Sequence, residues 1–279
     1  MRIARTLTLS SLILTLTIPT MGGCRWWRSH RPDGLSTPAS DFLPIKGEEV
    51  TAARRTAIDI ENPNGSVTVV VSDRYKRAYV YARAAWRSQY TKAEWEEVRN
   101  EDWVVAEHVI EDGNSILRIL SQATPDVDPP VHTDIRVLMP ACDGVFIRNA
   151  NGNVKVIGAG GAHTIESGFD FGPGGNIDVK TSRDISDPIT LRTSDGFIDL
   201  TLDDGSEGTL DLKTEDGTAF FSSKYGRTTN VQAETGHWRG VWHASTNPIT
   251  LQTLRGNVRV SVVDDPEQHT SGLRTSWYP

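Results

Sequence analysis

The sequence contains very little cysteine and no excess of positive charge. Its 279 residues include two cysteines, Cys24 and Cys142, and 29 Lys and Arg residues against 36 Asp and Glu residues. Two cysteines cannot build a disulfide framework, and Cys142, beside Pro140 in a short connector, is expected to be a buried and unreactive thiol. A net charge of -7 without a basic cluster argues against nucleic acid as a partner.

Catalytic and cofactor motifs are also missing from the sequence. No Gly-x-Ser-x-Gly motif of a nucleophilic serine is present, and the glycine-rich run 158–161 is not followed by a helical pattern. The acidic turns at 203–205 and 215–217 lack the ligand spacing of a known calcium loop. We therefore expect no catalytic residues, no cofactor and no metal site.

One apolar stretch stands at the N-terminus, where residues 1–23 have the features of an export signal. The stretch from Leu7 to Ile18 is too short and too polar to span a membrane. The tetrapeptide Met21-Gly22-Gly23-Cys24 resembles a bacterial lipobox, which implies lipid attachment at Cys24 and a membrane as partner. Because arginine rather than aspartate follows this cysteine, the resemblance implies the outer membrane. An ordinary secretory signal is the alternative, and the proline-rich residues 24–48 are expected to form a tether.

Seven glycines share one local pattern, in which a short alternating strand-like run follows the glycine. From the second of them onward the steps are 23, 21, 21, 19 and 20 residues, a period typical of stacked structural units. Apolar residues stand two and four positions after most of these glycines, and also five and seven positions before most of them. The seven glycines are Gly65, Gly152, Gly175, Gly196, Gly217, Gly236 and Gly256.

This periodicity predicts an all-β protein whose residues 141–263 form a single-stranded parallel β-solenoid. Trp238 replaces a smaller inward residue, while Gly240 and Ala219 are unusually small, which suggests that the coils align vertically. Residues 49–140 are expected to be a less regular β region that caps the array and contains one short helix at 91–98, and residues 264–279 a disordered tail. Because Asn-Gly and Asp-Gly also favour antiparallel hairpins, a meander or sandwich is the alternative.

The segment from Ala57 to Val262 carries Asn-Gly and Asp-Gly turns followed by Val-x-Val or Ile-Asp-Val strands. In these features it resembles the bacterial "putative adhesin" family of unknown function. The resemblance implies a β-solenoid and attachment at a surface, and it transfers no catalytic residue.

Side chains three positions after the glycines are expected to face solvent in one column. In that column Asp178 and Asp199 become adjacent carboxylates, on strands about 4.8 Å apart. Such acid pairs serve polysaccharide-cleaving β-helical enzymes, so a lyase or hydrolase is the alternative function, whereas a solvated charge ladder is the structural explanation. The full column is Lys155, Asp178, Asp199, Phe220, Arg239 and Arg259.

The segment 237–243 combines His237 and Arg239 on one face of a strand with tryptophans on the other. His237 and His243 stand about 20 Å apart at the rise of a strand, which is too far to share a metal. An outward Arg and His stripe is suited to an anionic glycan. The sequence therefore predicts a non-catalytic envelope lipoprotein that presents a rigid surface to an envelope polysaccharide or another envelope protein, with Asp178, Asp199, Arg239 and His237 as candidate ligand-binding residues.

Overall fold

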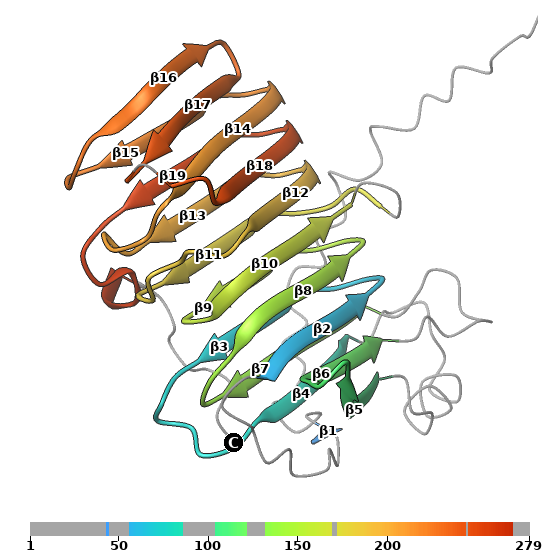
Figure 1. Ribbon diagram of the computed structural model, residues 1–279. Coiled ribbons are helices and arrows are strands. Elements are labelled where there is room, and N and C mark those ends of the chain that lie inside the picture. Colours follow the sequence, from blue (N-terminus) through green and yellow to red (C-terminus); the bar gives the residue numbers. More distant parts are fainter. Residues whose placement is uncertain are drawn as a thin grey trace, which may run out of the picture. The chain divides into compact units, whose positions relative to one another are not determined.

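The computed structural model describes residues 43–44, 56–85, 104–121, 132–168, 172–243 and 245–269, and these residues form an all-β fold (Figure 1). The all-β class agrees with the sequence-based prediction, and the described strands form two mixed sheets with mostly parallel pairing. Within the described ranges, no helix has the length and apolar character needed to cross a membrane. The predicted signal, Cys24, nearly all of the tether and the helix at 91–98 lie outside the described residues.

The first sheet, called sheet A, has nine strands, seven of which are parallel to their neighbours. In spatial order they are β1 (Leu43–Pro44), β4 (Tyr79–Ala85), β7 (His132–Met139), β3 (Val67–Val71), β9 (Val154–Ile157), β11 (Ile177–Thr181), β13 (Ile198–Leu202), β19 (Val258–Val262) and β15 (Ala219–Ser223).

The second sheet, called sheet B, has ten strands and also contains seven parallel ones. In spatial order they are β16 (Thr228–Glu234), β17 (His237–Trp242), β14 (Gly208–Asp216), β18 (Pro248–Arg255), β12 (Ile189–Asp195), β10 (Gly160–Ser167), β8 (Asp143–Asn149), β2 (Thr56–Asn62), β6 (Asn114–Ser121) and β5 (Val104–Glu111).

The parallel strands come in pairs, here called coils, each made of one sheet B strand followed along the chain by one sheet A strand. Neighbouring coils align residue for residue, so that Ile177 pairs with Ile198 and Val179 with Leu200. Their side chains and those of the facing sheet form one buried cluster of mainly Val, Ile and Leu. This is the packing that a strand buried on its inner face and stacked on identical neighbours favours.

The coils do not stack in the order of the sequence. The last coil, β18–β19, lies between β12–β13 and β14–β15, and the first coil, β2–β3, lies between β8–β9 and β6–β7. Figure 1 shows this as the red β18 between the yellow β12 and the darker β14, and as the blue β2 between two green strands. Residues 56–71 and 114–139, from the segment expected to cap the array, therefore include strands that belong to it.

Antiparallel strands close both ends of the parallel array. At one end β4 pairs with β7 and β5 with β6; at the other, β17 pairs with β14 and β16 with β17. Gly236, with φ of 72°, lies in the turn between β16 and β17. The prediction that Gly236 begins another parallel coil was wrong, because here the glycine makes the antiparallel hairpin that the same short motif also favours.

The other repeated glycines stack directly on one another at the turn between the two sheets. A Cβ atom on Gly256 would lie 2.2 Å from the carbonyl oxygen of Gly196, and one on Gly152 would lie 2.4 Å from that of Gly65. Such distances leave no room for a side chain, and φ of 126° at Gly256 disfavours one as well. Close approach of successive turns thus explains the glycine repeat.

A buried polar residue stands three positions before most of these glycines and ties each turn to its spatial neighbour. Thr193 donates a hydrogen bond to Gly175 O at 2.7 Å, and Thr214 donates one to Gly256 O at 2.7 Å. The second of these bonds joins the β14–β15 coil to the inserted β18–β19 coil. The hydroxyls therefore satisfy turn carbonyls that would otherwise be buried without a donor.

The two tryptophans of β17 fill the interior at the hairpin end. The Trp238 ring stacks on Phe221 of β15 at 5.1 Å, and a Cβ on Gly240 would lie 2.5 Å from the Trp238 ring. The expected compensation between Trp238 and Gly240 is therefore present. Because β17 is antiparallel, however, the assignment of Trp238 to a coil was wrong, although the coils themselves do align vertically.

Residues 264–269, expected within a disordered tail, are ordered against the coils. The short 3-10 helix η2 (Pro266–His269) follows β19, and the hydroxyl of Ser182 donates to Asp265 at 2.7 Å. The Ser182 amide donates to Glu267 at 3.1 Å. The rest of the predicted tail, 270–279, lies outside the described residues.

Candidate ligand-binding surface

The predicted solvent-facing column exists on the outer face of sheet A, with one exception. Lys155, Asp178, Asp199, Arg259 and Phe220 occupy paired positions on five neighbouring strands. Arg259 stands between Asp199 and Phe220 because the last coil is inserted there. The placement of Arg239 in this column was wrong, since Arg239 lies on β17 of sheet B.

Both acids of this column are engaged by cations. Asp178 lies 3.5 Å from Lys155 Nζ and 3.9 Å from Lys180 Nζ, and Asp199 accepts hydrogen bonds from two guanidinium nitrogens of Arg259. The hydrogen bond and the charge of Asp199 raise the pKa of Arg259 above its usual range. Neither carboxylate is therefore presented to solvent as an unpaired acid, which favours the charge-ladder explanation.

Arg239 and His237 meet a different acid, on the outer face of sheet B. His237 Nε2 lies 2.7 Å from Asp211 Oδ1, and Arg239 Nε donates to the same oxygen at 3.3 Å. Lys213 Nζ lies 3.4 Å from the other oxygen, Oδ2. We call these four residues, Asp211, Lys213, His237 and Arg239, the basic cluster.

The antiparallel register of β14 and β17 assembles this cluster. Asp211 pairs directly with Arg239, and Lys213 pairs with His237, so all four side chains share the outer face. Sequence reasoning missed Asp211 and Lys213 because their partners depend on the hairpin pairing with β14. The available signal was the alternation of β14, whose apolar Leu210 and Leu212 point inward and leave these residues outward.

Within the four residues of the basic cluster the cations outnumber the single carboxylate, and Glu234 of β16 pairs with His237 on the same face. Partial burial alone would raise the pKa of Asp211, but hydrogen bonds from His237 and Arg239 and the charges of Lys213 and Arg239 together lower it. One carboxylate thus faces two permanent cations and one histidine. The side chains of Lys213 and Arg239 are about half exposed, so their remaining donors are open to an anion.

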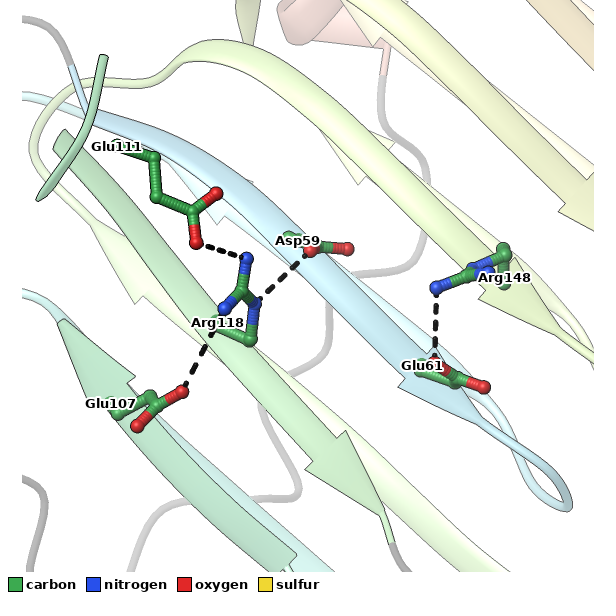
Figure 2. A network of polar contacts seen from close by, with 6 residues as sticks. All are labelled: Asp59, Glu61, Glu107, Glu111, Arg118 and Arg148. Carbon is green, nitrogen blue, oxygen red and sulfur yellow. Dashed lines mark hydrogen bonds and ion pairs between the residues drawn. The ribbon is translucent and has the colours of Figure 1, made fainter. Parts of the chain in front are cut away.

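The opposite end of sheet B carries the reverse balance, as Figure 2 shows. Arg118 lies 2.8 Å from Glu111, 3.4 Å from Asp59 and 4.0 Å from Glu107, so three carboxylates share one cation. Nearby, Arg148 and Glu61 form a one-to-one pair at 3.1 Å. The basic cluster is therefore a local property of the β14–β17 end rather than of the whole face.

Two buried groups in the core offer no chemistry. Burial raises the pKa of the Cys142 thiol to about 12, and its Sγ donates to Gly144 O at 3.2 Å, which matches the expected inert thiol. Burial lowers the pKa of His163 to about 4, and its Nδ1 lies 2.9 Å from Gly161 O. Across the described part of the chain, no group of three or more His, Cys, Asp or Glu side chains is arranged to hold a metal ion.

Comparison with known proteins adds a likeness in fold. No known protein family and no curated protein matches the sequence. A solved structure that the chain resembles is that of a "putative cell adhesion protein" from Clostridium sporogenes, with a TM-score of 0.52 and 8% sequence identity. The match covers 80% of this chain and 98% of the other. At this identity the likeness shows a shared fold and nothing about the ligand.

Proposed function

We propose that this protein is an exported, lipid-anchored binding protein of the cell envelope, whose β-solenoid presents the basic cluster to an anionic glycan. The proposal assigns no catalytic role to any residue. The observation that carries it is the shared carboxylate of Asp211, around which two cations and a histidine gather on an exposed face.

A sheet face suits a linear polymer better than a small ligand. Its side chains stand on strands about 4.8 Å apart and point in one direction, so successive charges of an extended chain meet successive strands. Lys213 and Arg239 lie on adjacent strands, and the Arg guanidinium can bind a carboxylate or sulfate through two donors. The export pattern at 1–24 and the fold shared with a protein described as adhesive support an envelope location.

The binding proposal is tested with the full chain in detergent and polygalacturonate as the anionic probe, with dextran as the neutral one. We expect Arg239→Gln and Lys213→Gln each to weaken polygalacturonate binding about tenfold, the effect of losing roughly 1.4 kcal/mol. Arg148→Gln is the matched control, because that arginine belongs to a one-to-one pair on the same face. The proposal would be rejected if all three variants bound polygalacturonate with the same affinity, or if the wild type bound dextran as tightly as polygalacturonate.

The absence of catalysis is tested at the acid pair of sheet A. Release of reducing ends or unsaturated sugars from polygalacturonate should stay at the level of buffer for the wild type and for Asp178→Asn and Asp199→Asn. Polymer cleavage by the wild type that either substitution abolishes, with unfolding unchanged, would establish the polysaccharide-cleaving alternative.

The anchor is tested by mass spectrometry of the mature N-terminus from membranes. A diacylglyceryl-modified and N-acylated Cys24 is expected, and Cys24→Ala should release the protein from the membrane fraction. An unmodified Cys24 in exported protein would disprove lipid attachment without touching the glycan proposal.

A further inference from the structure

The two sheets end unevenly at the hairpin end. The last coil in space is β14–β15, and beyond it sheet B continues with β17 and β16 while sheet A stops at β15. Sheet B therefore extends two strands further than sheet A, as the upper end of Figure 1 shows. We call this uneven end the step.

The step leaves two strand edges and both faces of β16 uncovered in the described part of the chain. β15 pairs only with β19, and β16 pairs only with β17. Nearly every residue of β16 is exposed, which means that neither of its faces is covered. Val231 on this strand is 48% exposed and Phe220 on β15 is 41% exposed.

A buried polar group at the step is also unsatisfied. The Trp242 side chain is 2% exposed, yet its indole Nε1 has no hydrogen-bond partner among the residues that the structure describes. Its ring packs on Phe221 of the edge strand β15. Buried indole nitrogens normally find an acceptor, so this unpaired nitrogen is an unusual feature of the hairpin end.

We propose that a second copy of this chain fills the step, related by a two-fold axis that runs along the strands and exchanges the two sheets. Under this rotation the overhanging strands of one copy continue sheet A of the other. The partner's β16 then lies beside β15, and the partner's β15 lies beside β16. The two overhanging strands of each copy, β17 and β16, extend past the β15 edge of the other copy, so the step is complementary to itself.

Strand polarity agrees with this pairing. β14 and β16 run in the same direction, since each is antiparallel to β17. The chain reverses at the turn between β14 and β15, so β15 runs opposite to β16, as the arrows in Figure 1 show. A rotation about the strand axis preserves strand direction, and both new contacts are therefore antiparallel ladders.

The same symmetry closes the assembly at two copies. The contact is isologous, so each copy uses its step once and no free step remains. A two-fold axis perpendicular to the sheets would instead make the two overhangs of sheet B collide. In the sheet-exchanging dimer, the partner's β16 pairs with the open edge of β15 and lies opposite β17, whose Trp238 and Trp242 already pack on Phe221.

Two lysine substitutions on β16 test its inward and outward faces independently. Ala233 pairs with the inward Trp238, whereas Gln232 pairs with the outward Arg239, so adjacent residues point to opposite sides. Lysine at the inward position must be buried in the dimer, and lysine at the outward position remains in solvent. We expect Ala233→Lys to weaken dimerisation at least a hundredfold and Gln232→Lys to leave it within about threefold.

Sedimentation velocity of the full chain in detergent, across a wide range of concentrations, measures the association, and amide hydrogen exchange locates it. Wild type should reach a dimer and no larger species, with amides of β15 and β16 protected in the dimer and exchanging in Ala233→Lys. A monomer at all concentrations, a polymer that grows with concentration, or a dimer that Ala233→Lys leaves intact would overturn the proposal. Thermal unfolding of Ala233→Lys as a folded monomer separates lost association from lost fold, and none of these outcomes depends on glycan binding.

Discussion

Acidification should destabilise the protein through one buried histidine. His163 is 1% exposed and occupies a core position of β10, where it pairs with Val145 on one side and Ile189 on the other. Nδ1 donates to Gly161 O, and the remaining acceptor, Nε2, has no partner among the described residues. A proton on Nε2 would therefore bring an uncompensated charge into the core.

The size of the stability loss and its pH range follow from the protonation of His163 in the folded and in the unfolded chain. Burial lowers the pKa of His163 from 6.5 to about 4 in the folded state. As pH falls through 6.5 the unfolded chain binds the proton first, so stability is complete above pH 6.5 and is lost progressively down to pH 4. A pKa difference of about 2.5, at about 1.36 kcal/mol for each unit, corresponds to about 3 kcal/mol.

Urea unfolding of the wild type and of His163→Val, followed by tryptophan fluorescence at pH 7 and pH 4, tests this reasoning. Valine matches the residue at the same position of the neighbouring β8, so the core should accept it. The wild type should lose about 3 kcal/mol more free energy of unfolding than the variant between the two pH values, because the other titrating groups contribute equally to both. An equal loss in both proteins would refute the assignment of the acid sensitivity to His163.

Three further predictions concern the stacked turns and the core thiol. Gly256→Ala should lower the free energy of unfolding by about 3 kcal/mol or more, because the added Cβ would meet Gly196 O. Gly113→Ala, at φ of 79° but with open space around it, should lower it by roughly 1 kcal/mol. Equal urea midpoints of the two variants would show that close approach is not the constraint. Thr253→Val should lower the free energy of unfolding by roughly 1 to 2 kcal/mol through the lost bond to Gly196 O, and an unchanged midpoint would argue against that bond. In Cys24→Ala, Cys142 should react with a maleimide only after unfolding, so rapid labelling of this native variant at pH 8 would contradict the burial of Cys142.

Much of the local structure could be predicted because it depends on residues close together in the chain. Alternation identifies the inward residues of each strand, as at Ile177 and Val179, whatever the neighbouring strand is. The spacing of the glycines predicted a recurring turn between strands, and the structure places Gly152 between β8 and β9 and Gly256 between β18 and β19. The outward positions of Asp178 and Asp199 and their adjacency follow from the same period.

The choice of neighbour could not be predicted, because many coils present nearly the same inner surface. Ile189 and Leu191 pair with Ile249 and Leu251 of the inserted coil, and Leu210 would offer a similar apolar partner. Alternation and turn spacing therefore cannot tell which coil stacks on which. Gly236 shows the same limit, since one turn motif serves a parallel coil and an antiparallel hairpin equally well.

The sequence by itself determined the all-β class, the inward and outward faces of most strands and the recurrence of a glycine turn, since these depend on alternation and spacing along the chain. Only the tertiary structure decided that the last coil inserts between two earlier ones, that Arg239 contacts Asp211 rather than the acids of sheet A, and that sheet B extends two strands beyond sheet A. Each of these depends on pairing between segments far apart in the chain, and a one-dimensional period carries no information about which distant edge a strand will meet.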